Sequence, residues 1–399
     1  MTRAIPFVGA AILLALNLAK SHRWSSSGAV ETYWARFWML GYSDGASRRA
    51  LLGQLVRWTV GAEVSWLTLS AVGIAVTGGV LGLVAVPYAR LHTPYGVRAT
   101  WRQQTAFESV AAIALVFSGA AAVVPLQLIG DPLQVALLLA LGYGIAAPKL
   151  GARWRAPVAI AVGAVAVLVH EASAFLVVPF LYATACNQLR GVSAGKVVAL
   201  VTLAAAAPIG LSHLLVQHTL GHGTSLRLMD GSLFTVTENP LPSLGTLWHE
   251  EVVARFGSIR GIAKTASFVP RIGLPIIAAV VALTGLCRDV TLPRRFTYLM
   301  VCSLPLYVIA HDWGRFATYS LLLAIALPSP GYTLLDVHCA VQRKTALAAC
   351  VVLVVCRTNR DWLMRGLSPI DFAYAAAAAL LCVAVVMFEP TQEREARAS

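Results

Sequence analysis

Two short clusters of ionisable residues come directly after long apolar runs, and each joins a histidine to a carboxylate. His170-Glu171 follows a run rich in Ala and Val, and His311-Asp312 follows another apolar run. A histidine beside a carboxylate can transfer a proton, bind a divalent cation or pair with an arginine. A structural pairing between helix ends is the competing interpretation for both clusters.

The second cluster continues as Trp313-Gly314-Arg315 and is therefore the more specific of the two. A guanidinium fork suits the oxygens of a phosphate, and a Trp ring beside it can stack on a sugar. We expect Arg315 and Trp313 to bind substrate, with His311 and Asp312 as catalytic residues next to them.

Two further aspartates lie in turns that follow other apolar or aromatic segments. Asp44 stands in the turn Gly41 to Gly45, shortly before Arg48 and Arg49, and Asp131 stands between a glycine and a proline. A turn or helix cap is the ordinary role for Asp44. The functional interpretation makes Asp44 a general base, with Arg48 and Arg49 holding an anionic group and Asp131 contributing to substrate binding.

The elements that position these residues are membrane helices, because the chain of 399 residues is 58% hydrophobic and only 12% charged. We expect an all-α, polytopic transmembrane bundle of about twelve spans in a single domain over residues 1–388, with a short charged tail at 389–399. The expected spans are 5–19, 64–88, 107–129, 133–147, 156–169, 172–186, 197–217, 271–287, 296–310, 316–330, 345–356 and 370–388.

The predicted membrane topology places the candidate residues on the same side of the bilayer. Tight basic clusters at Lys149 to Arg155 and at Arg288 to Arg295 favour placing those loops in the cytoplasm, together with both termini, in the inner (plasma) membrane. The four polar clusters around residues 44, 131, 170 and 312 then share the outer side. Several spans that lead to them have only about 15 residues, or about 22 Å of helix, so the clusters should lie below the membrane surface.

The two longest outer segments are 20–63 and 218–270. The first contains two amphipathic pieces, from Val30 to Leu40 and from Ser47 to Val60, whose aromatic and basic residues are typical of interfacial helices. The second ends in another amphipathic piece whose polar face carries His249 and Glu250. We expect these two residues to bind substrate, with a solvated helix face as the alternative.

The formal charge of +13 is scattered between apolar runs and forms no nucleic-acid motif, so membrane lipids and a phosphate-bearing ligand are the expected partners. The seven cysteines show no metal-binding spacing and read as buried apolar side chains. No cofactor is indicated with certainty. A divalent cation, Mg²⁺ or Mn²⁺, remains compatible with the carboxylates, while the metal ligands are unknown.

In architecture the chain resembles the GT-C class of polyprenyl-phosphate-dependent glycosyltransferases and, more loosely, bacterial polysaccharide polymerases. The likeness lies in a first long outer loop with two interfacial pieces and an acid near the membrane, followed by many spans with polar clusters outside. It implies a lipid-linked sugar donor and a role for Asp44 as the base or metal ligand of that loop. The chain departs from the class in lacking an adjacent acidic pair in this loop and a large soluble C-terminal domain.

Two other functions compete with glycosyl transfer for envelope polysaccharide or glycolipid assembly. A transporter or lipid flippase predicts polar groups distributed through the bilayer and often an inverted repeat, and neither is evident in the sequence. A membrane O-acyltransferase would use His170 or His311 as its base and needs no arginine-rich phosphate site. A scaffold without catalysis would not need ionisable groups below the membrane surface.

Overall fold

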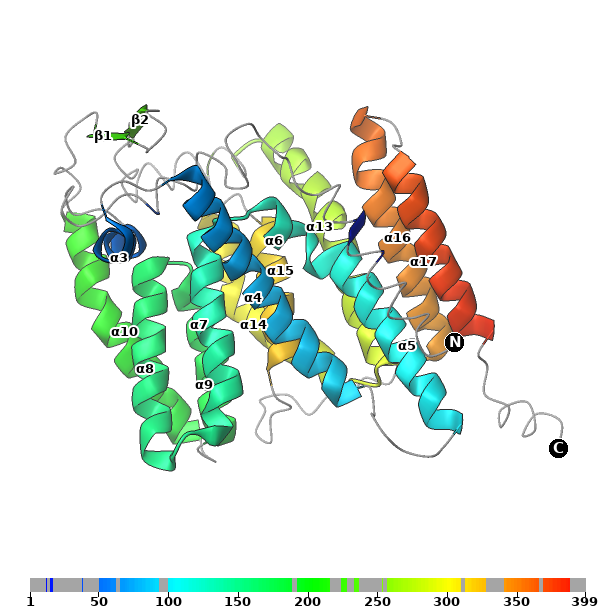
Figure 1. The fold of residues 1–399 in the computed structure, drawn as a ribbon, viewed down its shortest axis with the longest axis horizontal. Helices are drawn as coiled ribbons and strands as arrows, with labels where there is room; N and C mark the ends of the chain where they lie inside the picture. The colour runs from blue at the N-terminus through cyan, green and yellow to red at the C-terminus, as the bar shows by residue number, and fades with distance from the viewer. Residues whose placement is uncertain are drawn as a thin grey trace.

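The computed structural model describes most of the chain. The described residues are 12, 15–16, 38, 50–61, 65–92, 100–188, 192–215, 224–227, 233–236, 253, 257–309, 313–327, 341–365 and 369–387. Helices form nearly all of this part and pack side by side as a bundle (Figure 1). The expectation of a helical bundle is therefore confirmed.

Successive long helices run in opposite directions along the bundle (Figure 1). Those that run downward in Figure 1 are α4 (Trp66–His92), α7 (Pro132–Ala146), α9 (Ser173–Gln188), α13 (Ile259–Leu286), α15 (Trp313–Ala326) and α17 (Pro369–Met387). Those that return are α5 (Thr100–Val116) with η2 (Phe117–Ala121) and α6 (Val123–Gln127), then α8 (Ala152–Val169), α10 (Val192–Leu215), α14 (Leu292–Ile309) and α16 (Arg343–Arg365). A short 3-10 turn, η3 (Ala147–Lys149), follows α7.

We name the two ends of the bundle after residues in their turns. The Asp131 end, at the top of Figure 1, contains the turns before α7, α9 and α15. The Asp289 end, at the bottom, contains the turn between α13 and α14. Asp131, His170 and Arg315 therefore belong to one end, as the alternation of the predicted spans required.

Each predicted span from 64–88 onward overlaps at least one of these helices, and the first, 5–19, lies outside the described residues except for three helical positions. The differences in length are largest for the runs 271–287 and 345–356, which belong to the 28-residue helix α13 and the 23-residue helix α16. An apolar run marks residues suited to lipid, whereas backbone hydrogen bonding continues through polar residues until a glycine or proline interrupts it. Helix α16 ends at Arg365, directly before Gly366.

By length and composition, three helices in the described residues could cross a membrane. They comprise Trp66–Ala89, Pro132–Lys149 and Ala152–Val169, and shorter apolar helices occur elsewhere in the bundle. Large apolar side chains point away from the bundle, including Leu67 (80% exposed), Leu380 (70%) and Leu200 (66%). An apolar exterior of this kind supports a membrane location.

Glycines allow some of the closest helix contacts. A Cβ atom added to Gly285 of α13 would lie 2.4 Å from the Cβ of Ala346 in α16, and one added to Gly163 of α8 would lie 2.6 Å from Cγ2 of Thr202 in α10. Small residues at helix interfaces are typical of membrane bundles, where close packing replaces the hydrophobic effect as the source of association.

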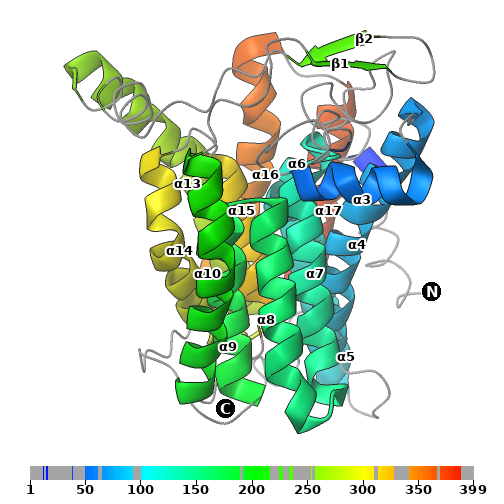
Figure 2. The same cartoon turned by 90° about the vertical axis from the view of Figure 1, so that its left-hand side faces the viewer.

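Helix α3 (Ala50–Val60) lies across the Asp131 end at a steep angle to the bundle helices (Figure 2). It buries Leu52 and leaves Trp58 72% exposed. This matches the helix predicted within Ser47 to Val60. Its position at a lipid interface stays a prediction.

One small sheet departs from the all-α expectation. Strands β1 (Thr224–Arg227) and β2 (Leu233–Val236) pair in antiparallel fashion within the second long segment, with Ser225 opposite Thr235. Each strand carries residues of good β-propensity, such as Thr224 and Val236. A four-residue strand is too short to produce the alternation by which sequence patterns reveal sheets.

Candidate functional site at the Asp131 end

Asp131 lies in the turn between α6 and α7 and is fully buried. The preceding Gly130 has a φ of +91°, a left-handed conformation that favours glycine, and the following proline occupies the first helical position. The Asp131 carboxylate accepts the backbone N–H of Leu133 at 3.0 Å and so caps α7. Its negative charge also suits the positive end of the helix dipole.

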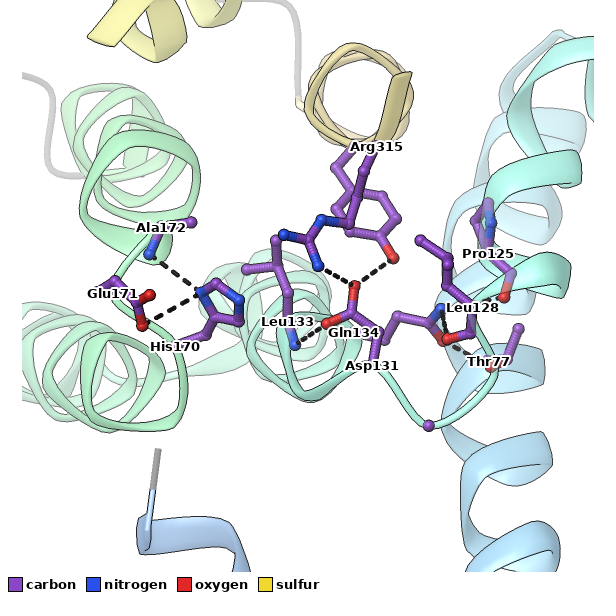
Figure 3. A network of polar contacts seen from close by, with 12 residues as sticks. Thr77, Pro125, Leu128, Asp131, Leu133, Gln134, His170, Glu171, Ala172 and Arg315 are labelled. Carbon is purple, nitrogen blue, oxygen red and sulfur yellow. Dashed lines mark hydrogen bonds and ion pairs between the residues drawn. The ribbon is translucent and has the colours of Figure 1, made fainter. Parts of the chain in front are cut away.

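Two residues of α15 reach the same carboxylate. Nη1 of Arg315 lies 3.4 Å from Oδ2 of Asp131 (Figure 3), and the Tyr319 hydroxyl donates to that oxygen at 3.0 Å. Arg315 belongs to the first turn of α15, where the helix dipole already supplies partial positive charge. Asp131 therefore compensates a cation that the helix end disfavours, and both side chains are buried (0% and 7% exposed).

Gln134 holds the turn that carries Asp131. Its Nε2 donates to the carbonyl oxygens of Pro125 and Leu128 at 3.0 and 2.9 Å, and its Oε1 accepts from the Thr77 hydroxyl of α4 at 2.5 Å (Figure 3). The same two carbonyls also accept the backbone N–H groups of Leu128 and Asp131, at 3.3 and 2.9 Å. One buried amide thus terminates α6 and joins it to α4 and α7.

Trp38 reaches the same turn from the first long segment. Its Nε1 donates to the carbonyl oxygen of Gly130 at 2.6 Å, and the side chain is 3% exposed. The interfacial position expected for Val30 to Leu40 stays a prediction, because Trp38 is the one residue of that piece that the structure describes. A Trp ring buries a large apolar surface and also supplies one N–H donor, and here the donor is used inside the protein.

His170 and Glu171 form the turn between α8 and α9. Nδ1 of His170 accepts the backbone N–H of Ala172 at 3.1 Å and lies 3.6 Å from Oε2 of Glu171 (Figure 3). His170 is 2% exposed and Glu171 is 46% exposed. Because Nδ1 acts as an acceptor, the neutral ring carries its proton on Nε2. In this arrangement His170 can donate a hydrogen bond, and Glu171 is the accessible acid.

Trp313 begins α15 at the same end of the bundle. Its ring centroid lies 6.3 Å from that of Tyr307 in α14, with the planes tilted by 57°. The other candidate residues lie outside the described part of the chain: Asp44, Arg48, Arg49, His249, Glu250, His311 and Asp312.

Among the predicted site residues, the structure joins Asp131 directly to Arg315. The His170-Glu171 turn lies at the same end, on the other side of Leu133 from this pair (Figure 3). The sequence suggested separate substrate-binding roles for Asp131 and Arg315. Their pairing means that Nη1 of the Arg315 guanidinium is already engaged by an internal carboxylate.

Sequence reasoning missed Tyr319, Gln134 and Thr77. Tyr319 follows Arg315 by one helical turn, so this spacing alone could have indicated that the two side chains share a face. No comparable signal exists for Gln134 and Thr77, which are 57 residues apart and meet only through the packing of α4 on α7.

A second buried cluster lies at the Asp289 end. Arg295 of α14 donates to Oδ2 of Asp289 and to the carbonyl oxygen of Leu327 at the end of α15. The Tyr88 hydroxyl donates to the same carboxylate oxygen at 3.1 Å, and Thr291 donates to Oδ1 at 3.0 Å. The sequence indicated only that these loop residues set the membrane orientation, because a basic cluster gives no sign of burial.

No group of three or more His, Cys, Asp or Glu side chains that could hold a metal ion occurs within the described ranges. At the Asp131 end, the described residues offer hydrogen-bond donation, a buried ion pair and the partly exposed Glu171 carboxylate. Comparison of the chain with protein-family models, with curated proteins and with solved structures finds no match.

Proposed function

We propose that the protein is an integral membrane glycosyltransferase or polymerase that uses a sugar linked to polyprenyl phosphate or diphosphate. In this proposal the chain has about twelve spans in the inner membrane, both termini are cytoplasmic, and the Asp131 end faces outward. The observation that carries the proposal is the meeting of polar residues from three distant segments, around 131, 170 and 315, at one end of an apolar bundle. Helix α3 lies across that same end (Figure 2).

The proposed reaction needs a carboxylate and fixed positive charge. A carboxylate removes the proton of the acceptor hydroxyl, the oxygen attacks the anomeric carbon, and the bond from that carbon to the donor phosphate oxygen breaks. We assign the base to Asp44 or Asp312 and the donor phosphate to Arg48, Arg49 and Arg315. Glu171 and His170 would orient the acceptor, or Glu171 would bind a divalent cation.

Complementation of a strain lacking the gene tests the proposal. Asp44→Asn, Asp312→Asn and Glu171→Gln are compared with the wild type and with Asp371→Asn, a control acid in α17 that has no role in the proposed reaction. We expect the control to restore the glycan. At least one of the other variants should reach the membrane at normal levels, lose the glycan and accumulate its lipid-linked precursor. Full glycan production by all three variants would refute the proposal.

A transporter or flippase is the second candidate, because charged residues are buried at both ends of the bundle. Besides the Asp131 pair, Asp289 and Arg295 are each only 5% exposed at their side chains. Buried charge near both membrane faces suits a protein that admits a ligand from either side. The same complementation assay distinguishes the two functions. Loss of transport leaves the lipid-linked precursor on the inner leaflet.

A further inference from the structure

Helix α15 is enclosed by the rest of the bundle. Every residue from Arg315 to Ile325 is buried, and the helix packs against α14, α13, α4, α7 and α9. Halfway along it, the hydroxyl of Ser320 lies 3.4 Å from that of Ser303 in α14, and both side chains are fully buried. Helix α15 is therefore tightly packed over most of its length in this structure.

The two ends of α15 are held by the same three residue types. At its beginning, Asp131 binds Arg315 and Tyr319, which we call the Asp131 triad. At its end, Arg295 donates to the carbonyl oxygen of Leu327 and to Asp289, which also accepts from Tyr88. We call Asp289, Arg295 and Tyr88 the Asp289 triad. Each triad joins α15 to helices that are distant in sequence.

Buried ion pairs of this kind are poorly explained by stability alone. Apolar residues of similar volume often stabilise a protein as well as a buried ion pair does, whereas loss of one charged partner is strongly destabilising. Charges inside a membrane bundle commonly mark sites of function.

We propose that the two triads are latches that hold opposite ends of α15, and that a path for a ligand along this helix forms when they open. In this mechanism a ligand enters from one side when the triad on that side opens while the other stays closed. This inference concerns access and goes beyond the proposed glycosyl transfer, because either a transferase or a transporter could use it.

The two latches differ in their electrostatics. Arg315 lies at the positive end of the α15 dipole, and Asp131 supplies its compensating charge. Arg295 instead donates to a carbonyl at the negative end of the same helix, so it keeps a favourable partner when Asp289 is neutralised. The Asp131 latch should therefore open more readily, and an anionic group such as a phosphate could replace Asp131 on Arg315.

Thiol labelling from each side of the membrane tests the latches. Ser320→Cys places a reporter midway along α15, and a membrane-impermeant maleimide is applied to intact cells and to inside-out vesicles. We expect Asp131→Asn to raise the labelling rate from one side by about tenfold, equivalent to about 1.4 kcal/mol of opening free energy. Asp289→Asn should raise the rate from the opposite side only, by a smaller factor.

Matched variants separate this mechanism from general loss of structure. The same substitutions in a chain without Ser320→Cys measure how far the maleimide labels the native cysteines. Tyr319→Phe and Tyr88→Phe weaken each triad without leaving a charge unpaired, and should give smaller changes with the same sidedness. Unchanged labelling in all four variants, or labelling that rises from both sides together, would overturn the proposal.

Discussion

Gln134 illustrates how one buried side chain can determine the geometry of a whole turn. Its amide group satisfies two carbonyls of the α6 terminus and accepts the hydroxyl of Thr77, so no polar atom of that amide group is without a partner. A buried polar group contributes little net stability when it is paired and costs much when its partner is removed. The position of Asp131, three residues earlier, depends on this arrangement.

Replacing Gln134 with Leu should therefore destabilise the protein. The substitution keeps the volume but removes the hydrogen bonds from Gln134 to the carbonyls of Pro125 and Leu128, which then keep only the backbone N–H groups of Leu128 and Asp131 as donors. We expect a loss of about 0.5–1.5 kcal/mol for each hydrogen bond removed. Gln127→Leu, in the neighbouring and partly exposed α6 position, should change stability by less than about 0.5 kcal/mol. Thermal unfolding of the two purified variants in detergent makes the comparison, and equal melting temperatures would contradict the role given to Gln134.

At the scale of helices, packing distances decide which elements belong together. The approach of α13 to α16 depends on Gly285, since any side chain there would overlap Ala346. These two helices are separated by α14 and α15 in the chain. Small residues on both surfaces allow the contact, in accordance with the way helices associate in lipid.

Gly285→Ala should accordingly cost about 1–3 kcal/mol through overpacking. Gly82→Ala is the matched control, because a Cβ atom at that helical position of α4 meets no atom within 4 Å. Alanine should stabilise the control by about 0.5–1 kcal/mol through its higher helix propensity. The fraction of protein that remains monodisperse after heating distinguishes the two variants, and a stable Gly285→Ala variant would show that α13 and α16 are not closely packed.

At the scale of the whole molecule, the Asp131 end is assembled from segments that are far apart in the chain. Trp38 and Gly130 are 92 residues apart, and Asp131 and Arg315 are 184 residues apart. The bundle brings these residues together because its helices alternate in direction (Figure 1). The first long segment is joined to this end through the ring and N–H of Trp38.

Trp38→Phe tests that connection. Phenylalanine retains most of the apolar ring but lacks the N–H, so the buried Gly130 carbonyl loses its donor, at about 1–3 kcal/mol. Trp58→Phe in α3 is the control, since that side chain is 72% exposed and should tolerate the change within about 0.5 kcal/mol. A lower melting temperature for the control than for Trp38→Phe would show that the contact with Gly130 contributes little.

The sequence by itself determined the helical bundle and the end of it to which each turn belongs. Long apolar runs require helices, because a helix satisfies its own backbone hydrogen bonds in lipid, and the alternation of the spans then brings residues 131, 170 and 315 to one end. Only the tertiary structure decided which of these side chains bind one another. Asp131 pairs with Arg315, Trp38 is buried and donates to the Gly130 carbonyl, and Asp289 with Arg295 forms a second cluster. The physical reason is that apolar periodicity records which residues avoid water, whereas an ion pair depends on the rotation and packing of helices, which leave no local pattern in the chain.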